Sequence, residues 1–137
     1  PGELDMSYRH SSITEEHYMV LGVTIALEAG SQEQIRAKME ELKEKRVEKQ
    51  PLEYPSAGST FKRPEGYFAG KLIMDAGLRG FQVGGAAVSE KHCGFVINKE
   101  KATASDVYRL IQEVQQEVYR QFGVKLETEV KMVGDFR

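Results

Sequence analysis

The sequence has few of the features that mark membrane, secreted or nucleic-acid-binding proteins. It contains one cysteine, Cys93, so no disulfide framework can form within the chain, and a lone thiol is typical of a reducing compartment. No apolar run approaches the length that spans a bilayer. With 19 basic and 21 acidic residues, the formal net charge is -2, which provides no general attraction to nucleic acid or to an anionic membrane. We therefore expect a cytoplasmic protein that binds neither nucleic acid nor membrane, and any bound anion must be held locally.

Three kinds of cofactor site also lack their sequence signatures. No GxGxxG follows an expected strand, so a dinucleotide-binding fold is not indicated. The three histidines and the single cysteine provide no pair at metal-ligand spacing, and we expect no metal site. Residues 66–71, GYFAGK, are one residue too short for a phosphate loop, and Leu72 stands where a magnesium-binding hydroxyl is required. The sequence therefore disfavours a nucleoside triphosphatase.

The length of 137 residues fits one domain, or a small domain that carries a piece of a neighbour. The chain opens on Pro1 without an initiator methionine or a signal peptide, and we expect it to be the later part of a longer polypeptide. Two prolines, Pro51 and Pro55, make residues 47–56 the best candidate for a domain junction.

Local patterns predict the elements on either side of this junction. Residues 17–28, HYMVLGVTIALE, are apolar and β-branched and predict one largely buried strand, and shorter extended structure is expected over 6–12. Ser31, with Gln34 three residues later, begins a surface helix with a narrow apolar stripe that ends before Pro51.

From Pro55 onward we expect a small α+β unit in the order loop, helix, strand, strand, helix, strand. Its helices are predicted at 69–76, closed by Gly77, and from the cap Thr103 to the stop at Gly123. Its strands are predicted at 81–83, 94–98 and 126–133. Alternation in the last strand places Glu129 on the side away from the core.

Residues 54–70, YPSAGSTFKRPEGYFAG, combine small residues, hydroxyls and cations with few aliphatic residues. Ser59 is open to two interpretations: its hydroxyl caps a turn, or it is polarised by Lys62 and Arg63 so that it can donate a proton. Cys93 beside His92 is a buried small hydrophobe or an activated thiolate, and strand alternation, which separates neighbouring side chains, favours the first. Spacing alone leaves Arg9 and Glu129 as surface charges.

Five segments nevertheless resemble, in order, one known family. They read YRHSS at 8–12, QPLEYPSAGSTFKRP at 50–64, AGKLIMDAGLRG at 69–80, GGAAVSEKH at 84–92 and FGVKLETEV at 122–130. The resemblance is to the UDP-N-acetylenolpyruvoylglucosamine reductase family, the MurB flavoenzymes of peptidoglycan precursor synthesis. The chain lacks room between Gly30 and Pro51 for the tyrosine-bearing insertion of one subclass, so it resembles the shorter subclass.

The resemblance implies a division of the chain and a set of cofactors. Residues 1–52 would be the C-terminal remnant of an FAD-binding domain, and 53–137 a substrate-binding domain. NADPH would reduce FAD, and the reduced flavin would deliver hydride to the enolpyruvyl group of the nucleotide sugar. The chain alone is expected to be inactive, and the whole protein to be a monomer.

The resemblance also implies the site residues. Ser59 would be the proton donor, and Arg9 and Glu129 would surround the substrate carboxylate, with Arg9 also near the cofactor. Lys62, Arg63 and His92 would bind substrate, and Lys62 would ease proton donation by Ser59. The alternative is a non-catalytic domain in which the glycine-containing loop and its cations bind a sugar nucleotide or another anion.

Overall fold

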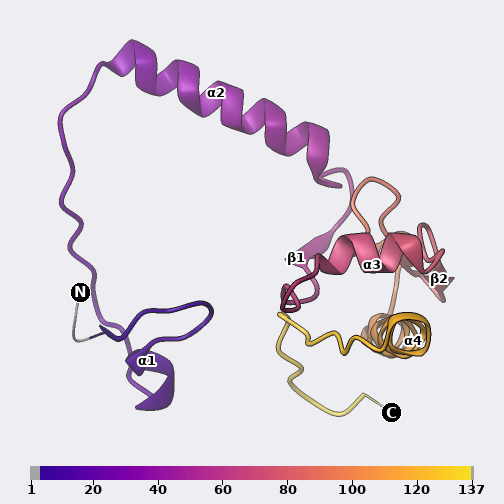
Figure 1. Ribbon diagram of the computed structural model, residues 1–137. Coiled ribbons are helices and arrows are strands. Elements are labelled where there is room, and N and C mark those ends of the chain that lie inside the picture. Colours follow the sequence, from indigo (N-terminus) through magenta and orange to yellow (C-terminus); the bar gives the residue numbers. More distant parts are fainter. Residues whose placement is uncertain (1–3, 137) are drawn as a thin grey trace. The chain divides into compact units, whose positions relative to one another are not determined.

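The structure, a computed structural model, describes residues 4–136. The chain divides into two compact units, Pro1–Arg36 and Ala37–Arg137. Figure 1 shows the elements in chain order, and the boundary between the units falls within the helix α2, Gln32–Lys49. No helix among the described residues is both long and apolar enough to cross a membrane.

The first unit contains a tight turn followed by one helical turn, α1, Ser12–Glu15. Ser7 and His10 exchange two backbone hydrogen bonds, of 3.2 and 3.3 Å, and Arg9 between them has a φ of 58°. Extended structure over 6–12 was therefore a wrong prediction for the middle of this segment, because the chain reverses there.

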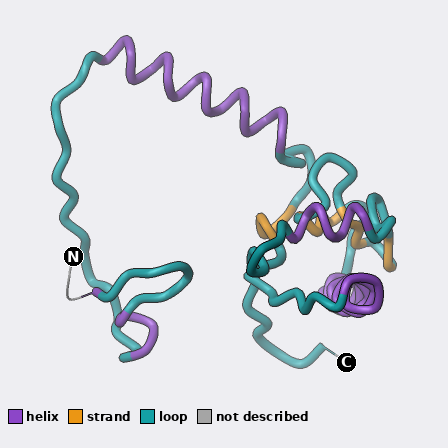
Figure 2. Tube along the Cα trace, viewed as in Figure 1, coloured by secondary structure: helices purple, strands orange, loops and turns teal. Residues whose placement is uncertain are grey.

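The strand expected over residues 17–28 is absent, and that prediction is wrong for this chain. Figure 2 shows a loop along this segment, in which Met19, Leu21 and Leu27 are 84%, 92% and 87% exposed. A strand is stable only when a neighbouring strand pairs with its backbone and covers its apolar side chains. Among residues 4–136 no strand pairs with this segment.

The helix α2 begins and ends where its local signals predict. The hydroxyl of Ser31 accepts a hydrogen bond from the amide of Gln34 at 3.5 Å, and the helix ends at Lys49, before Pro51. None of its residues is buried, which confirms a surface helix. Ion pairs one turn apart line its surface: Lys38–Glu41, Lys43–Glu40 and Lys45–Glu41.

The second unit contains an antiparallel sheet of four strands in the order β1-β4-β3-β2. The strands β2, Gln82–Val83, and β4, Phe95–Asn98, confirm the expected ones. The strands β1, Ser56–Ser59, and β3, Ala86–Val88, were not expected, because small residues give little local strand signal. They form because β4 offers a pairing edge on each side. The α+β class is confirmed, and β1 and β3 are two strands that were not predicted.

Two helices complete this unit, α3 at Ala69–Asp75 and α4 at Ala104–Phe122, as predicted. The helix α4 packs on β2, β3 and β4, and α3 packs on α4 (Figure 1). Thr103 and Asp106 form the reciprocal capping box, and Gly123 ends α4 with a φ of 68°. The core side chains of α4 are almost completely buried: Leu110, Ile111, Val114 and Val118. Each such side chain contributes about 1.5–3 kcal/mol through burial.

The segment after α4 was expected to be a strand over 126–133, but it pairs at only one bridge, Phe61 with Thr128. Backbone hydrogen bonds extend this pairing by one residue on each side, from Lys62 to Glu127 and from Glu129 to Thr60. The strand prediction was therefore wrong in extent. The segment nevertheless runs beside the residues that follow β1.

Candidate functional site

Ser59 ends β1, which lies at the edge of the sheet. The pairing of β1 with β4 is irregular between Ser56 and Ser59, and Gly58 between them has a φ of 92°, which suits glycine. The Ser56 hydroxyl donates to the carbonyl of Val96 at 2.9 Å. The Ser59 side chain is exposed and makes no hydrogen bond within residues 4–136, so it caps no turn there. Its hydroxyl is therefore available to a ligand.

Beside Ser59 lies a cavity of about 440 Å³, which we call the Ser59 cavity. Its wall is formed by the residues after β1, by α3 with the turn that follows it, and by the loop before β4. It is lined by Ser59, Phe61, Arg63, Phe68, Ala69, Gly70, Lys71, Met74, Arg79, Lys91, His92, Cys93 and Gly94. Four lysines or arginines and one histidine belong to this wall, and no aspartate or glutamate does. A chain with a net charge of -2 thus has a locally positive cavity, which suits an anionic ligand.

Two of the predicted substrate-binding residues lie in this wall and are held by neighbours. The guanidinium of Arg63 lies 4.0 Å from the centre of the Phe68 ring, and its Nε donates to the carbonyl of Tyr67 at 3.3 Å. The Nδ1 of His92 accepts from the amide of Gly94 at 3.1 Å. A neutral His92 that accepts at Nδ1 carries its proton on Nε2, which is then a donor.

Lys62, the other predicted substrate-binding residue, does not line the Ser59 cavity. Its ammonium forms an ion pair with Glu127 at 3.0 Å. Side chains alternate along the extended residues 61–63, so Phe61 and Arg63 line the cavity while Lys62 does not. The proposed effect of Lys62 on Ser59 stays a prediction.

The two remaining predicted site residues, Glu129 and Arg9, belong to different units of the chain. Glu129 is half-buried, and its amide donates to the carbonyl of Thr60 at 2.9 Å, so its backbone lies beside the residue that follows Ser59. Arg9 belongs to the first unit, where its guanidinium lies 5.4 Å from the centre of the Tyr8 ring. The structure therefore brings Ser59 close to the backbone of Glu129, and the roles of Arg9 and Glu129 stay predictions.

Cys93 behaves as the small buried hydrophobe that alternation favours. Burial raises the pKa of its thiol, and the positive charge of Arg79 opposes that effect only in part. A thiol with a raised pKa is a poor nucleophile at neutral pH. The described part of the chain holds no group of three side chains that could bind a metal ion.

Sequence inspection missed three cations of the cavity wall: Lys71, Arg79 and Lys91. Two of them lie within the quoted family segments at 69–80, and Lys91 lies within the segment at 84–92. The sequence shows that these residues are basic. No pattern in the neighbouring residues, however, predicts that α3 with its following turn and the loop before β4 line one cavity.

Comparison with known proteins gives a consistent result. The family model described as "UDP-N-acetylenolpyruvoylglucosamine reductase, C-terminal domain" matches residues 50–133. A UDP-N-acetylenolpyruvoylglucosamine reductase of Agathobacter rectalis is 66% identical over 134 residues, which cover 98% of this chain and 43% of that protein. The protein of the same name from Lachnoclostridium phytofermentans is 63% identical over 97% of this chain and 43% of its own length.

A solved structure is also similar to the chain. The crystal structure of UDP-N-acetylenolpyruvylglucosamine reductase (MurB) from Thermus caldophilus matches with a TM-score of 0.71 and 35% identity, over 93% of this chain and 46% of that chain. The chain thus spans less than half the length of the relatives that it matches.

Proposed function

Because the chain belongs to the family of the UDP-N-acetylenolpyruvoylglucosamine reductase C-terminal domain, we propose that it is the substrate-binding part of such an oxidoreductase. Its substrate would be the enolpyruvyl nucleotide sugar of peptidoglycan precursor synthesis, in a cytoplasmic and monomeric protein. The observation that carries the proposal is the Ser59 cavity, in which an available hydroxyl lies among cationic side chains.

We assign residues 1–52 to the end of an FAD-binding domain and 53–137 to the substrate-binding domain. One feature supports this division. The apolar segment 17–28 has the composition of a buried strand yet is exposed here. Such exposure is expected of an element whose packing partner lies elsewhere in a longer protein, and the matched relatives are longer.

The described residues fit a flavin poorly on their own. They contain no glycine-rich dinucleotide loop, and Arg9 is the one residue that the family resemblance connects with the cofactor. We therefore propose that most of the FAD and NADPH sites lie upstream of this chain. When bound there, a flavin reduced by NADPH would supply the hydride for the enolpyruvyl double bond.

The residues of this chain would then stabilise charge and transfer one proton. After hydride has added to one carbon of the double bond, negative charge spreads onto the substrate carboxylate, where Arg9 and Glu129 are placed by the resemblance. Ser59 would give its proton to the other carbon, which completes reduction to the lactyl ether. A neutral serine is a weak acid, so a cation and a hydrogen-bond donor near the resulting alkoxide would ease the transfer. Arg63 provides the charge and His92 the donor at the wall of the same cavity.

The test uses the chain joined to the upstream region found in its longer relatives. We expect this protein to bind FAD and to oxidise NADPH steadily only when UDP-N-acetylglucosamine enolpyruvate is present, as followed by NADPH absorbance and product mass. An equal rate of steady NADPH oxidation with and without this substrate would contradict the proposal.

The positive cavity by itself also fits the alternative, a non-catalytic domain that binds a sugar nucleotide. The same protein distinguishes the two functions. Tight binding of the nucleotide sugar with no turnover, even with FAD and NADPH bound, would favour the binding domain over the reductase.

A further inference from the structure

Two polar side chains are buried among residues 4–136, those of Thr60 and Ser89, which are 3% and 1% exposed. A hydroxyl in such a position costs free energy unless it forms hydrogen bonds. Ser89 directly follows β3 and begins the loop that brings Lys91 and His92 to the wall of the Ser59 cavity. The hydrogen bonds of Ser89 therefore bear on the shape of that wall.

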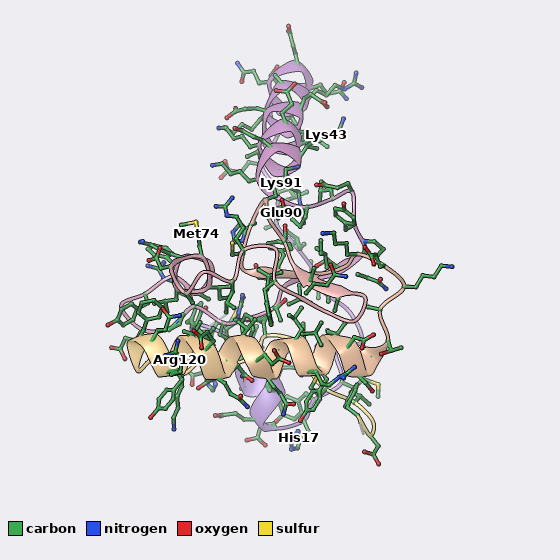
Figure 3. All side chains as sticks on the ribbon, turned by 90° about the vertical axis from the view of Figure 1, so that its right-hand side faces the viewer. His17, Lys43, Met74, Glu90, Lys91 and Arg120 are labelled. Atoms are coloured by element: carbon green, nitrogen blue, oxygen red, sulfur yellow. The ribbon has the colours of Figure 1, made fainter. Side chains whose placement is uncertain are left out.

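The hydroxyl of Ser89 closes a tight turn at the start of this loop. Its Oγ accepts from the amides of Lys91 at 3.2 Å and His92 at 3.3 Å, two and three residues later in the chain. Serine hydroxyls commonly stabilise turns in this way. Figure 3 shows Glu90 and Lys91 on this turn, after β3. The amide of Ser89 donates to the carbonyl of Phe95 at 2.9 Å, so the residue that holds the turn is itself tied to β4.

The ring of His92 is held by further contacts. Its Nδ1 accepts from the amide of Gly94 at 3.1 Å, and it meets the Phe95 ring edge-on, with the ring centres 5.0 Å apart. A Cβ atom on Gly94 would lie 2.9 Å from Cε1 of His92, so the ring needs a glycine there. No group of residues 4–136 bonds to Nε2 of His92, which leaves this N–H as a donor for a ligand in the cavity.

We propose that Ser89 is a positioning residue for His92: its hydroxyl fixes the turn that holds the Nε2 donor of His92 where substrate binds. The assignment rests on the proposed function, in which His92 binds substrate. Ser89 is not among the residues that line the Ser59 cavity, so it acts through His92 rather than by contact with the ligand. A donor that is fixed before binding loses less conformational freedom than a mobile one and binds substrate more tightly.

The test measures kcat/KM for UDP-N-acetylglucosamine enolpyruvate in the longer protein. Ser89→Ala removes the acceptor of both amides, and kcat/KM should fall about 10-fold, as for the loss of a hydrogen bond to substrate. Ser89→Thr keeps the accepting oxygen and should restore most of the wild-type value. Thr103→Ala is the matched control and should leave kcat/KM unchanged. It also removes a hydroxyl that accepts from a backbone amide, but at the start of α4, outside the cavity wall.

A double-mutant cycle determines whether Ser89 acts through His92. His92→Ala should lower kcat/KM at least as much as Ser89→Ala, and Ser89→Ala should cause no further fall when His92 is already alanine. A merely structural role of Ser89 would instead give effects that add.

Two further measurements do not depend on the folding of Ser89→Ala. Gly94→Ala displaces the His92 ring while the Ser89 hydroxyl stays in place, and it should lower kcat/KM to a similar extent. In the wild type, the amides of Lys91 and His92 should exchange slowly with solvent hydrogen, although both side chains are exposed.

Several outcomes would overturn this proposal and leave the proposed function intact. They are a wild-type kcat/KM in Ser89→Ala or Gly94→Ala, additive effects of Ser89→Ala and His92→Ala, an equal fall in Thr103→Ala, and rapid exchange of the two amides. A wild-type protein that does not reduce the enolpyruvyl substrate would overturn this proposal and the proposed function together.

Discussion

The amide of Glu129 donates a hydrogen bond to the carbonyl oxygen of Thr60 at 2.9 Å, so two distant parts of the sequence meet directly after Ser59. Thr60 is only 3% exposed, and its Oγ1 accepts from the amide of Val96 at 2.9 Å. One buried threonine thus links β4, the end of β1 and the segment that carries Glu129. This link holds the backbone directly after Ser59.

Replacement of Ser59 by alanine separates proton donation from flavin reduction. In the longer protein, Ser59→Ala should lower the rate of product formation by about 10²- to 10⁴-fold, the usual contribution of a general acid. Reduction of FAD by NADPH should stay near the wild-type rate in stopped-flow measurements. Ser56→Ala is the matched control on the same strand, because its hydroxyl bonds to Val96 within the fold. Normal turnover by Ser59→Ala would rule out the proton-donor role.

Removal of the Thr60 hydroxyl should destabilise the second unit. Thr60→Val keeps the shape of the side chain but leaves the buried amide of Val96 without its acceptor, at a cost of about 1–3 kcal/mol. Urea unfolding followed by circular dichroism measures this loss. Thr24→Val, in an exposed loop, should leave the unfolding free energy almost unchanged. An equal effect of both substitutions would show that the hydroxyl does not support the fold.

The capping box of α4 predicts a second stability change. Thr103→Ala removes the side-chain acceptor for the amide of Asp106, and the loss should be about 1 kcal/mol in the free energy of unfolding. Thr103→Ser keeps the hydroxyl and should retain most of the wild-type stability. If serine and alanine are equally destabilising, the cap hydrogen bond is not the cause.

Two carboxyls of α4 predict how stability responds to acid. Hydrogen bonds from the backbone and side chain of Thr103 lower the pKa of Asp106 from 3.8 to about 2, and the Arg120 guanidinium is the main cause of a pKa of about 2 for Glu117. Both groups bind protons more weakly when folded, so their contribution is present above the unfolded pKa values and is lost as the pH falls toward 2.

Acid titration of the thermal midpoint should therefore show a fall between about pH 4.5 and 2, the interval between the ordinary and the folded pKa values. Asp106→Asn should be less stable than the wild type at neutral pH and should show a smaller fall over this interval. A variant whose acid response matches that of the wild type would contradict the assignment to Asp106.

The helices were predictable because their ends depend on local residues. Ser31, Thr103 and Gly123 act within one turn of the helices that they begin or end, and the structure has them in those roles. The strands β1 and β3 depend on β4, which is distant in sequence from β1, and their small residues carry no local signal. The segment 17–28 is the opposite case: its composition predicts a strand, but no partner strand is present among the described residues and no strand forms.

The candidate site was predictable only in part, for a related reason. Ser59, Arg63 and His92 came from the family resemblance, and the structure places all three around one cavity. The place of Arg79 in the cavity wall could not be predicted from its sequence context, because a hydrogen bond to the carbonyl of Glu90 holds it across two elements. Lys62 likewise pairs with Glu127, which is distant in sequence, and does not line the cavity.

The single cysteine of the chain makes the Ser59 cavity unusually easy to observe. Cys93 is buried in its wall, and burial raises the pKa of the thiol, so thiol reagents react with it mainly when this region opens. The rate of chemical labelling therefore reports local opening, and a ligand that fills the cavity should slow it. The protein thus carries its own occupancy probe, at one position and without any engineered residue.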